Sequence, residues 1–243
     1  MDELTALLGA NTYPGRGLVL AGTAHGALVA YFVTGRSPAS QQREIRRGAA
    51  GELLVSPLGE GADDPLRHYA AARTSDDWLV VGNGRQVDTV LEKLEAGHAP
   101  QIALDGLEHE PDAPIFTDRI TLVVSRATPV EAVFGVARRS AGGRTTSDIH
   151  MLVVREPAPG DAVLLTTYKS DGETIEGGRP FLEASWAAGG AAAEAVNAAP
   201  KAVNAAGLLD TVWAALEPRY RVAAMALDPA HGLGGALIRN ERR

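Results

Sequence analysis

Two glutamates, Glu108 and Glu110, stand two residues apart in a stretch that Pro111 and Pro114 make stiff and extended. Alternate side chains of an extended chain point the same way, so we expect these two carboxylates to be neighbours. Neighbouring carboxylates raise each other's pKa, and a carboxyl group with a raised pKa suits general acid–base catalysis. The alternative interpretation of the same residues is a solvated acidic loop.

Two arginines stand where a strand begins or ends. Arg16 follows Pro14 and Gly15 just ahead of an apolar run, and Arg36 follows another such run at the point where it opens into a loop. A guanidinium group can fork onto a phosphate or a carboxylate, so both are candidates for binding an anion. The alternatives are a solvated turn for Arg16 and an ordinary salt-bridged strand end for Arg36.

A third polar stretch, Thr166–Gly172, closes an apolar strand and contains Tyr168 and Lys169. Strand alternation places Lys169 on the face of Thr167 and places Tyr168 on the opposite face. The two side chains are therefore not expected to enter one pocket unless a bulge intervenes. The alternative for Lys169 is a position in solvent.

Strands and one helix are expected to position these groups. Gly17–Ala21 and Ala27–Thr34 predict a hairpin with a longer loop, in which Tyr31 and Phe32 face opposite sides. Apolar spacing predicts a helix over Val87–Leu94, stopped at Gly97. Further strands are expected at Trp78–Val81, Arg119–Ser125, Val130–Arg138, Ile149–Arg155, Ala162–Lys169 and Arg221–Leu227.

The last third of the chain is rich in alanine. From Glu183 to Leu216 we predict two helices, with breaks at Pro200 and Gly207; a flexible linker is the alternative. Strands followed by a few grouped helices favour an α+β fold over repeated βαβ units. Because no internal repeat or linker stands out, we expect one domain over residues 1–243, with the helical part at about 183–218.

The composition narrows the class of protein. The formal charge is −7, from 23 Lys and Arg against 30 Asp and Glu, and nucleic-acid binders need a basic surface, so no nucleic-acid partner is expected. The start of the chain lacks the basic segment of a signal peptide, and no apolar run approaches the ~20 residues of a membrane helix. We therefore expect a cytoplasmic protein without a membrane partner.

Several kinds of site have no support in the sequence. The chain has no cysteine, which excludes disulfides, thiolate zinc sites and cysteine nucleophiles. Its six histidines show no metal-ligand spacing, so no metal is expected. Phosphate-loop, dinucleotide-binding and serine-elbow motifs are also absent.

Five stretches together resemble the archaeal-type inosine monophosphate (IMP) cyclohydrolase family and its bacterial relatives. They occur in the family's order and at compatible spacing, within about residues 10–175. The stretches are NTYPGRG (Asn11–Gly17), AYFVTGRS (Ala30–Ser37), GNGRQVDT (Gly82–Thr89), EPDAPIFTDRI (Glu110–Ile120) and TYKSDG (Thr167–Gly172).

The resemblance implies an α+β fold like that of the N-terminal-nucleophile hydrolases, a four-layer αββα sandwich, without a processed nucleophile. It also implies a step of purine biosynthesis, in which 5-formamidoimidazole-4-carboxamide ribotide closes its ring to IMP and loses water. Because the amide nitrogen attacks a formyl carbon of the same molecule, this reaction needs no cofactor, metal or cosubstrate. The implied partner is a small purine ribotide, and a homo-oligomer is compatible with it.

Roles for the candidate residues follow from the resemblance and their charges. Glu110 is expected to transfer the proton or to fix the carboxamide, and Lys169 or Arg119 to stabilise the developing oxyanion. Arg16 or Arg36 is expected to bind the 5′-phosphate. The other candidates are Tyr31 as a proton donor and, as contacts to the substrate, Asn83, Gly84, Asp88 and Tyr168.

Two stretches depart from the family pattern. Asp118 stands where the family has the proline of a Thr-Pro-Arg-Ile-like segment, and Glu173–Gly178 replaces a Pro-Ser-Phe-type stretch. The second change removes an aromatic residue near the expected site. These departures leave open a non-catalytic homologue that binds purine ribotides, and a different amide or ribotide hydrolase on the same scaffold.

Overall fold

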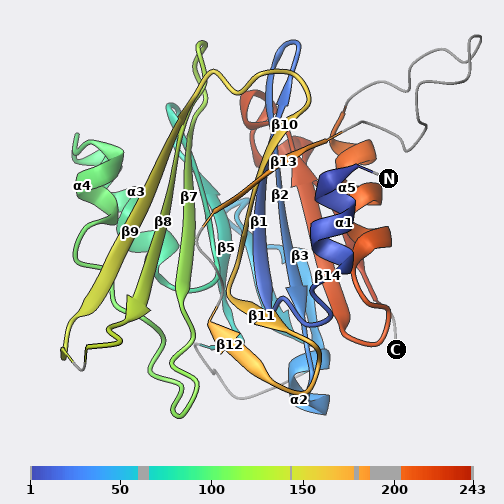
Figure 1. The fold of residues 1–243 in the computed structure, drawn as a ribbon. Helices are drawn as coiled ribbons and strands as arrows, with labels where there is room; N and C mark the ends of the chain where they lie inside the picture. The colour runs from blue at the N-terminus through green and yellow to red at the C-terminus, as the bar shows by residue number, and fades with distance from the viewer. Residues whose placement is uncertain (1, 60–65, 143, 178–180, 187–203, 242–243) are drawn as a thin grey trace, which may run out of the picture.

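Two antiparallel β-sheets lie face to face in this computed structural model, which describes residues 2–59, 66–142, 144–177, 181–186 and 204–241 (Figure 1). Within those residues one sheet has six strands, another has seven, and a short ribbon has two. The structure is therefore mixed α and β, with mostly antiparallel sheets and few helices.

The seven-stranded sheet follows the order of the chain, whereas the six-stranded sheet does not. In spatial order, the six-stranded sheet consists of β13 (Leu182–Ser185), β10 (Asp161–Thr166), β1 (Arg16–Thr23), β2 (Gly26–Thr34), β14 (Arg221–Leu227) and β15 (Leu237–Asn240). The seven-stranded sheet consists of β3 (Arg43–Arg47), β4 (Leu53–Pro57), β5 (Tyr69–Thr74), β6 (Trp78–Gly82), β7 (Arg119–Ser125), β8 (Glu131–Arg139) and β9 (Ser147–Arg155). The ribbon consists of β11 (Tyr168–Ser170) and β12 (Ile175–Gly177).

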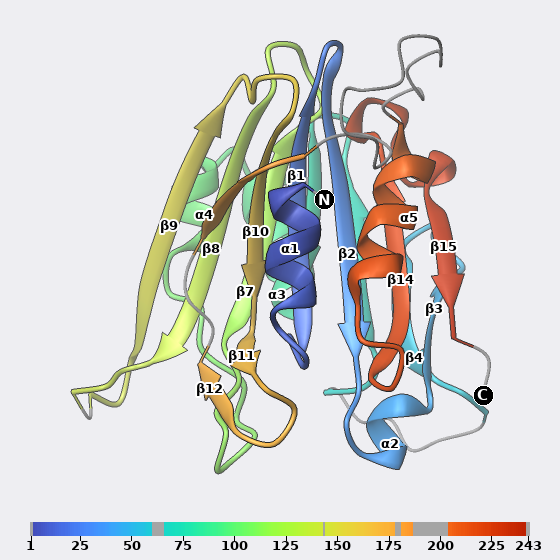
Figure 2. The ribbon, with the colours of Figure 1, turned by 45° about the vertical axis from the view of Figure 1, so that its right-hand side comes forward.

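Helices cover the outer faces of both sheets (Figures 1 and 2). Those that pack on the six-stranded sheet are α1 (Glu3–Gly9) and α5 (Ala205–Ala215). Those that pack on the seven-stranded sheet are α3 (Gln86–Glu95) and α4 (Pro100–Leu104). The remaining short elements are α2 (Pro38–Gln41) and the 3₁₀ turns η1 (Pro229–His231) and η2 (Leu233–Gly235). None of the helices in the described part of the chain has the length and apolar character to cross a membrane.

The main core lies between the two sheets. Alternate residues of β2 divide between this core and the helical face: Tyr31 packs between the sheets, whereas Phe32 packs under α1 and α5. Leu18 lies opposite Tyr31 in the β1–β2 register, so Arg16, two residues before Leu18, points from the same strand face toward the other sheet. Strand alternation thus brings Arg16 to the end of the core.

Several predicted elements are confirmed. The predicted strand at Arg119–Ser125 is β7, that at Arg221–Leu227 is β14, and the predicted helix over Val87–Leu94 is α3. The hairpin is also confirmed, but its loop is short, because Gly22 and Thr23 continue β1 and Thr23 pairs with Gly26.

Two predictions were wrong. The strand expected over Ala162–Lys169 breaks at Thr167, because the hydroxyl of Thr166 donates to the carbonyl of Tyr168 at 2.9 Å and the chain leaves the sheet. The stretch from Glu183 begins as strand β13 rather than a helix, because it pairs with β10.

The helical prediction for the alanine-rich part is only partly tested. Gly207 does not break a helix: it lies in the first turn of α5, where its N–H donates to the side chain of Asn204 at 3.0 Å. The predicted break at Pro200 and most of the first predicted helix lie outside the described residues.

The lack of a side chain at Gly15 allows the start of β1 to pack closely against the junction of β10 and β11. Its φ is +74°, and an added Cβ would lie 2.2 Å from Thr167 Oγ1 and 2.5 Å from Tyr168 Cδ2. Gly15→Ala is therefore expected to lower the free energy of unfolding by roughly 2–5 kcal/mol, from backbone strain and overpacking, as measured by urea unfolding. Gly9→Ala is the control, since its Cβ would meet no atom within 4 Å. An equal loss in both variants would contradict this account.

Candidate functional site

The candidate site lies at the end of the sandwich where β1 begins and β6 and β10 end (the lower end in Figure 1). Arg16 comes from the six-stranded sheet, and Asn83 and Asp118 come from the ends of β6 and β7 in the other sheet. Glu110 reaches the same place from the loop before β7. Residues from three distant parts of the chain thus meet between the two sheets.

Arg16 and Glu110 form a buried ion pair. Nη2 of Arg16 donates to both carboxylate oxygens of Glu110, at 3.1 Å to Oε1 and 2.9 Å to Oε2. The Glu110 residue is only 2% exposed. A buried charge of this kind persists only when it is paired and hydrogen-bonded, and Arg16 supplies the pairing.

Asn83 holds the same carboxylate from the other side. Its Nδ2 donates to Glu110 Oε1 at 3.2 Å and to the backbone oxygen of Asp118 at 3.0 Å. Its Oδ1 accepts from the N–H of Ile120 at 2.8 Å and from Gln86 Nε2 at 3.0 Å. Because these four bonds saturate the amide, Asn83 is placed to orient Glu110 rather than to contact a ligand.

Burial sets the proton affinity of Glu110. Removal from water raises the pKa of Glu110 above the usual value for a glutamate, although the charge of Arg16 acts in the opposite direction. Glu108 does not cause this shift: it is exposed and accepts from Ser147 at 2.8 Å. The expected pairing of Glu108 with Glu110 was therefore wrong, because the chain turns the two carboxylates toward different partners.

Arginines gather in the region of Glu110, beside the carboxylates of Asp112 and Asp118. Burial alone would lower the pKa of Arg16, but Glu110 and the nearby tyrosines raise it well above its usual value. Arg119 is close enough for its charge to lower the pKa of Glu110. Arg43 is also buried, and burial lowers its pKa. This part of an otherwise acidic chain is suited to an anionic ligand.

Two tyrosines form a hydroxyl pair in the same region. The hydroxyls of Tyr31 and Tyr69 are 2.8 Å apart, and Tyr31 is fully buried. Burial and the neighbouring Tyr69 hold the pKa of Tyr31 well above its usual value, so its phenol stays protonated at neutral pH. Tyr31 lies on the strand face of Arg16, as alternation requires.

Among the described residues, the other candidates form no hydrogen bond or ion pair with Glu110. Arg36 is exposed and donates to the backbone oxygen of Glu173 at 3.2 Å. Lys169 is exposed and stands opposite Glu176 in the β11–β12 ribbon, on the far side from buried Tyr168. Asp88 pairs with Arg73 across α3 and β5. Gly84 is buried beside Arg119, whose Nε would lie 3.7 Å from an added Cβ.

Asp118 forms an ion pair with Arg138 at 3.5 Å. An added Cβ on Gly177 would lie 2.9 Å from the guanidinium of Arg138, so Arg138 contacts both departures from the family pattern, Asp118 and the stretch that contains Gly177. Burial raises the pKa of Asp118 to about 6, against the opposing charge of Arg138. The two departures are therefore structurally linked.

The raised pKa of Asp118 predicts a pH-dependent stability. Below about pH 4 the carboxyl is protonated in both the folded and the unfolded chain, and the free energy of unfolding is at its highest with respect to this group. As pH rises to about 6 and above, the folded chain must also give up the proton from a buried site, so the free energy of unfolding falls. A pKa of about 6 against the usual 3.8 corresponds to a fall of roughly 3 kcal/mol in the free energy of unfolding. Asp118→Asn should remove this loss between pH 4 and 7.5, as measured by urea unfolding at each pH. Parallel curves for variant and wild type would contradict it.

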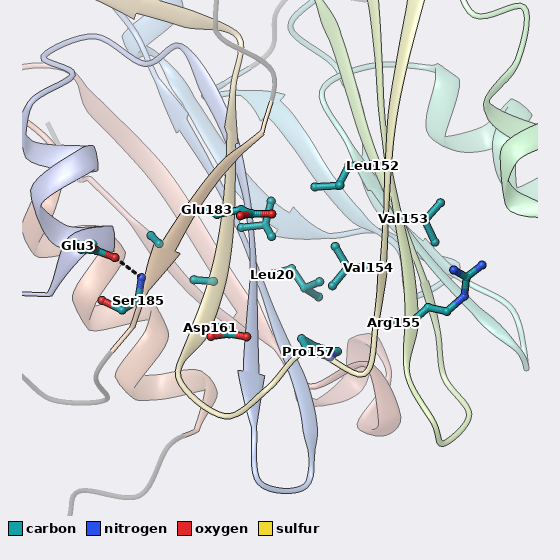
Figure 3. Close-up of a pocket in the computed structure, with 13 residues that line it drawn as sticks. Glu3, Leu20, Leu152, Val153, Val154, Arg155, Pro157, Asp161, Glu183 and Ser185 are labelled. Atoms are coloured by element: carbon teal, nitrogen blue, oxygen red, sulfur yellow. Dashed lines mark hydrogen bonds between the residues drawn. The ribbon is translucent and has the colours of Figure 1, made fainter.

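A groove larger than the cavity at the candidate site lies elsewhere. It has a volume of about 580 Å³ between the edge strands β9 and β13, with an apolar floor that includes Leu20, Leu152 and Val154 (Figure 3). Asp161, at the start of β10, lines it, whereas the Arg16–Glu110 pair lies near the end of β10. A smaller cavity of about 310 Å³ borders the candidate site and is lined by Asp118, Thr167 and Tyr168.

Four residues of this region were not among the site residues predicted from the sequence: Arg43, Tyr69, Asp112 and Thr117. Tyr69 precedes three alanines and Arg43 opens a charged strand, so neither shows the apolar alternation that marks a strand. Asp112 and Thr117 bracket a proline-containing loop, and an aspartate in that place is typical of a side chain that caps a turn. That signal was present in the sequence.

Comparison with known proteins gives one family. The model of the family "IMP cyclohydrolase-like protein" matches residues 13–226. An IMP cyclohydrolase of Methanopyrus kandleri is 33% identical over 141 residues, which cover 54% of this chain and 71% of the relative. One of Halobacterium salinarum is 32% identical over 187 residues, 75% of this chain and 86% of the relative. One of Natronomonas pharaonis is 38% identical over 119 residues, 46% and 58% of the two chains.

Proposed function

We propose that this chain, which belongs to the IMP cyclohydrolase-like family, closes the purine ring of 5-formamidoimidazole-4-carboxamide ribotide to give IMP and water. The observation that carries the site assignment is the buried carboxylate of Glu110, held by Arg16 and Asn83. All three residues belong to the stretches that resemble the family.

Glu110 is the general base of this proposal. In the reaction the carboxamide nitrogen forms a bond to the formyl carbon and gives up one N–H proton, the formamido nitrogen gives up its own proton, and the formyl oxygen leaves with these two hydrogens as water. Oε2 of Glu110 accepts only the bond from Arg16 among the hydrogen bonds of the described residues, so it has lone-pair capacity for that proton. Its raised pKa improves it as a base, and acid–base assistance of this kind contributes about 10²–10⁴-fold in rate.

Two arginines are assigned to the negative charges of the substrate, one to the oxyanion and one to the 5′-phosphate. Arg119 is the better placed of the two candidates for the oxyanion, since it acts electrostatically on Glu110 and its buried Nε has no hydrogen-bond partner among the described residues, whereas Lys169 faces away. Arg36 is the better candidate for the 5′-phosphate, because it is exposed, whereas Arg16 is occupied by Glu110. Holding the amide against the formyl group supplies further acceleration.

The packing of helices on both outer faces supports the finer fold assignment, a four-layer αββα sandwich like that of the N-terminal-nucleophile hydrolases. In this proposal the chain uses that scaffold without a processed terminal nucleophile. The acid–base group is instead a glutamate in a loop between the sheets.

The test is a cofactor-free assay of the purified chain with the formylated ribotide, in which ultraviolet absorbance reports ring closure. Closure well above the spontaneous rate is the expected result. Binding of IMP without closure would replace this function with a non-catalytic ribotide binder. Loss of the formyl group as formate would point to a hydrolase on the same scaffold.

A further inference from the structure

The loop that carries Glu110 is closed by a chain of hydrogen bonds. The N–H of Glu110 donates to the backbone oxygen of Thr117 at 2.9 Å. The carboxylate of Asp112 then receives two hydrogens from Thr117: Oδ1 accepts the backbone N–H at 2.6 Å, and Oδ2 accepts the hydroxyl at 2.5 Å. Asp112 therefore fixes both the backbone and the side chain of Thr117.

The direction of the next bond follows from counting hydrogens. The hydroxyl oxygens of Thr117 and Tyr168 are 2.5 Å apart. A carboxylate can only accept, so the single hydroxyl hydrogen of Thr117 goes to Asp112. The hydrogen between Thr117 and Tyr168 must then come from Tyr168. With that hydrogen engaged, the Tyr168 oxygen offers only lone pairs to any other group.

The Tyr168 side chain is beside the candidate site. Thr117, Tyr168 and Thr167 line the cavity of about 310 Å³, and Thr167 accepts the backbone N–H of Arg16 at 3.1 Å. Tyr168 is 5% exposed and stacks on Tyr13, with ring centroids 5.8 Å apart. Burial raises the pKa of Tyr168, so the phenol retains the hydrogen that it donates to Thr117.

We infer that Asp112 is a positioning residue that acts through Thr117 to make Tyr168 a hydrogen-bond acceptor, so that the site selects an N–H or O–H group of the ligand. On the proposed function, that group is one N–H of the attacking carboxamide, while Glu110 accepts the other. The two acceptors together turn the amide nitrogen toward the formyl carbon. Asp112 itself contacts no reacting atom.

Three substitutions distinguish the effect of the direction of these hydrogen bonds from the effect of the shape of the loop. Asp112→Asn keeps an oxygen for the Thr117 N–H and places an NH₂ group against the Thr117 hydroxyl. Thr117 must then donate to Tyr168, which reverses the chain and turns the Tyr168 hydrogen toward the ligand. Thr117→Val removes the hydroxyl at similar volume, and Thr117→Ser restores it.

The kinetic expectation is a selective loss. Asp112→Asn and Thr117→Val should each lower kcat/KM about 10- to 100-fold, because the ligand then faces the wrong or an unsatisfied partner. Thr117→Ser should stay within a few-fold of wild type, and Asp112→Asn should add nothing to Thr117→Val. Asp171→Asn is the matched control, since the exposed Asp171 carboxylate also accepts backbone N–H groups, those of Glu173 and Thr174, but no hydroxyl within the described part of the chain.

A second readout is independent of turnover. The chain has five tyrosines, so ¹³Cζ-labelled tyrosine gives few signals, and Tyr168→Phe assigns the one of interest. Asp112→Asn and Thr117→Val should move the Tyr168 signal, whereas Asp171→Asn should not. An unmoved signal in Asp112→Asn would overturn the inference, as would a moved signal with unchanged kcat/KM. If wild type closes no ring but the signal moves, the hydroxyl polarity stands and the proposed function fails.

Discussion

Replacing Glu110 by glutamine is expected to lower kcat by about 10²–10⁴-fold, with a much smaller change in KM. Glutamine has nearly the same shape, and its amide oxygen still accepts from Arg16, so the ligand site keeps its form. The amide cannot take up a proton, however, so the step that moves the amide N–H to the enzyme loses its acceptor. Steady-state kinetics with the formylated ribotide measure both constants.

Glu108→Gln is the matched control for this substitution. Glu108 lies two residues away, is exposed and bonds to Ser147, so its loss should leave kcat unchanged. A second signature is the pH profile. Because the pKa of Glu110 is raised, wild-type kcat should fall on the acid side at a higher pH than an ordinary glutamate would give. Unchanged turnover in Glu110→Gln would remove this carboxylate from the mechanism.

Replacing Arg16 by methionine is expected to lower the free energy of unfolding by about 3–5 kcal/mol, because it leaves the buried Glu110 charge without its partner. The pKa of Glu110 should also rise further once the cation is gone. Urea unfolding at neutral pH measures the loss, and the loss should shrink as pH falls and Glu110 takes up a proton.

Two comparisons isolate the pairing from the lost volume. Combining Arg16→Met with Glu110→Gln should recover most of the stability, since neither charge then remains buried. Arg155→Met breaks the exposed pair between Arg155 and Glu131 and should cost less than about 1 kcal/mol. If Arg16→Met and Arg155→Met destabilise equally, the Arg16–Glu110 pair is not a buried charge pair in the sense described.

The predictable part of this molecule is its regular part. Strand β7 and helix α3 follow from apolar patterns that repeat at a fixed period, so their positions can be read without knowledge of what packs on them. Strand β3 could not be read in this way, because four of its five residues are charged and only Ile45 and Arg43 are buried. Strand β13 exists because β10 is there to pair with it, and no local signal records that partner.

The candidate site shows the same division. Glu110 stands out in the sequence because a glutamate directly before a proline, in a polar loop, has no packing reason to be there. Its partner Arg16 lies 94 residues away, and the spacing of either residue says nothing about the other. The assignment of Asn83 to Glu110, rather than to substrate, likewise needed the bonds themselves. Residue types indicated the chemistry, whereas the tertiary structure was needed to show which residues bind to each other.

Because Arg16 from one sheet and Asn83 at the end of a strand of the other sheet together hold Glu110, the candidate site exists only while the two sheets are docked. A ligand held there is linked by mass action to the whole fold: it binds the folded chain and not the unfolded one. At 100 times its dissociation constant, such a ligand adds about 2.7 kcal/mol to the free energy of unfolding. On the proposed function, the supply of ribotide is therefore expected to act on the stability of the folded chain as well as on turnover.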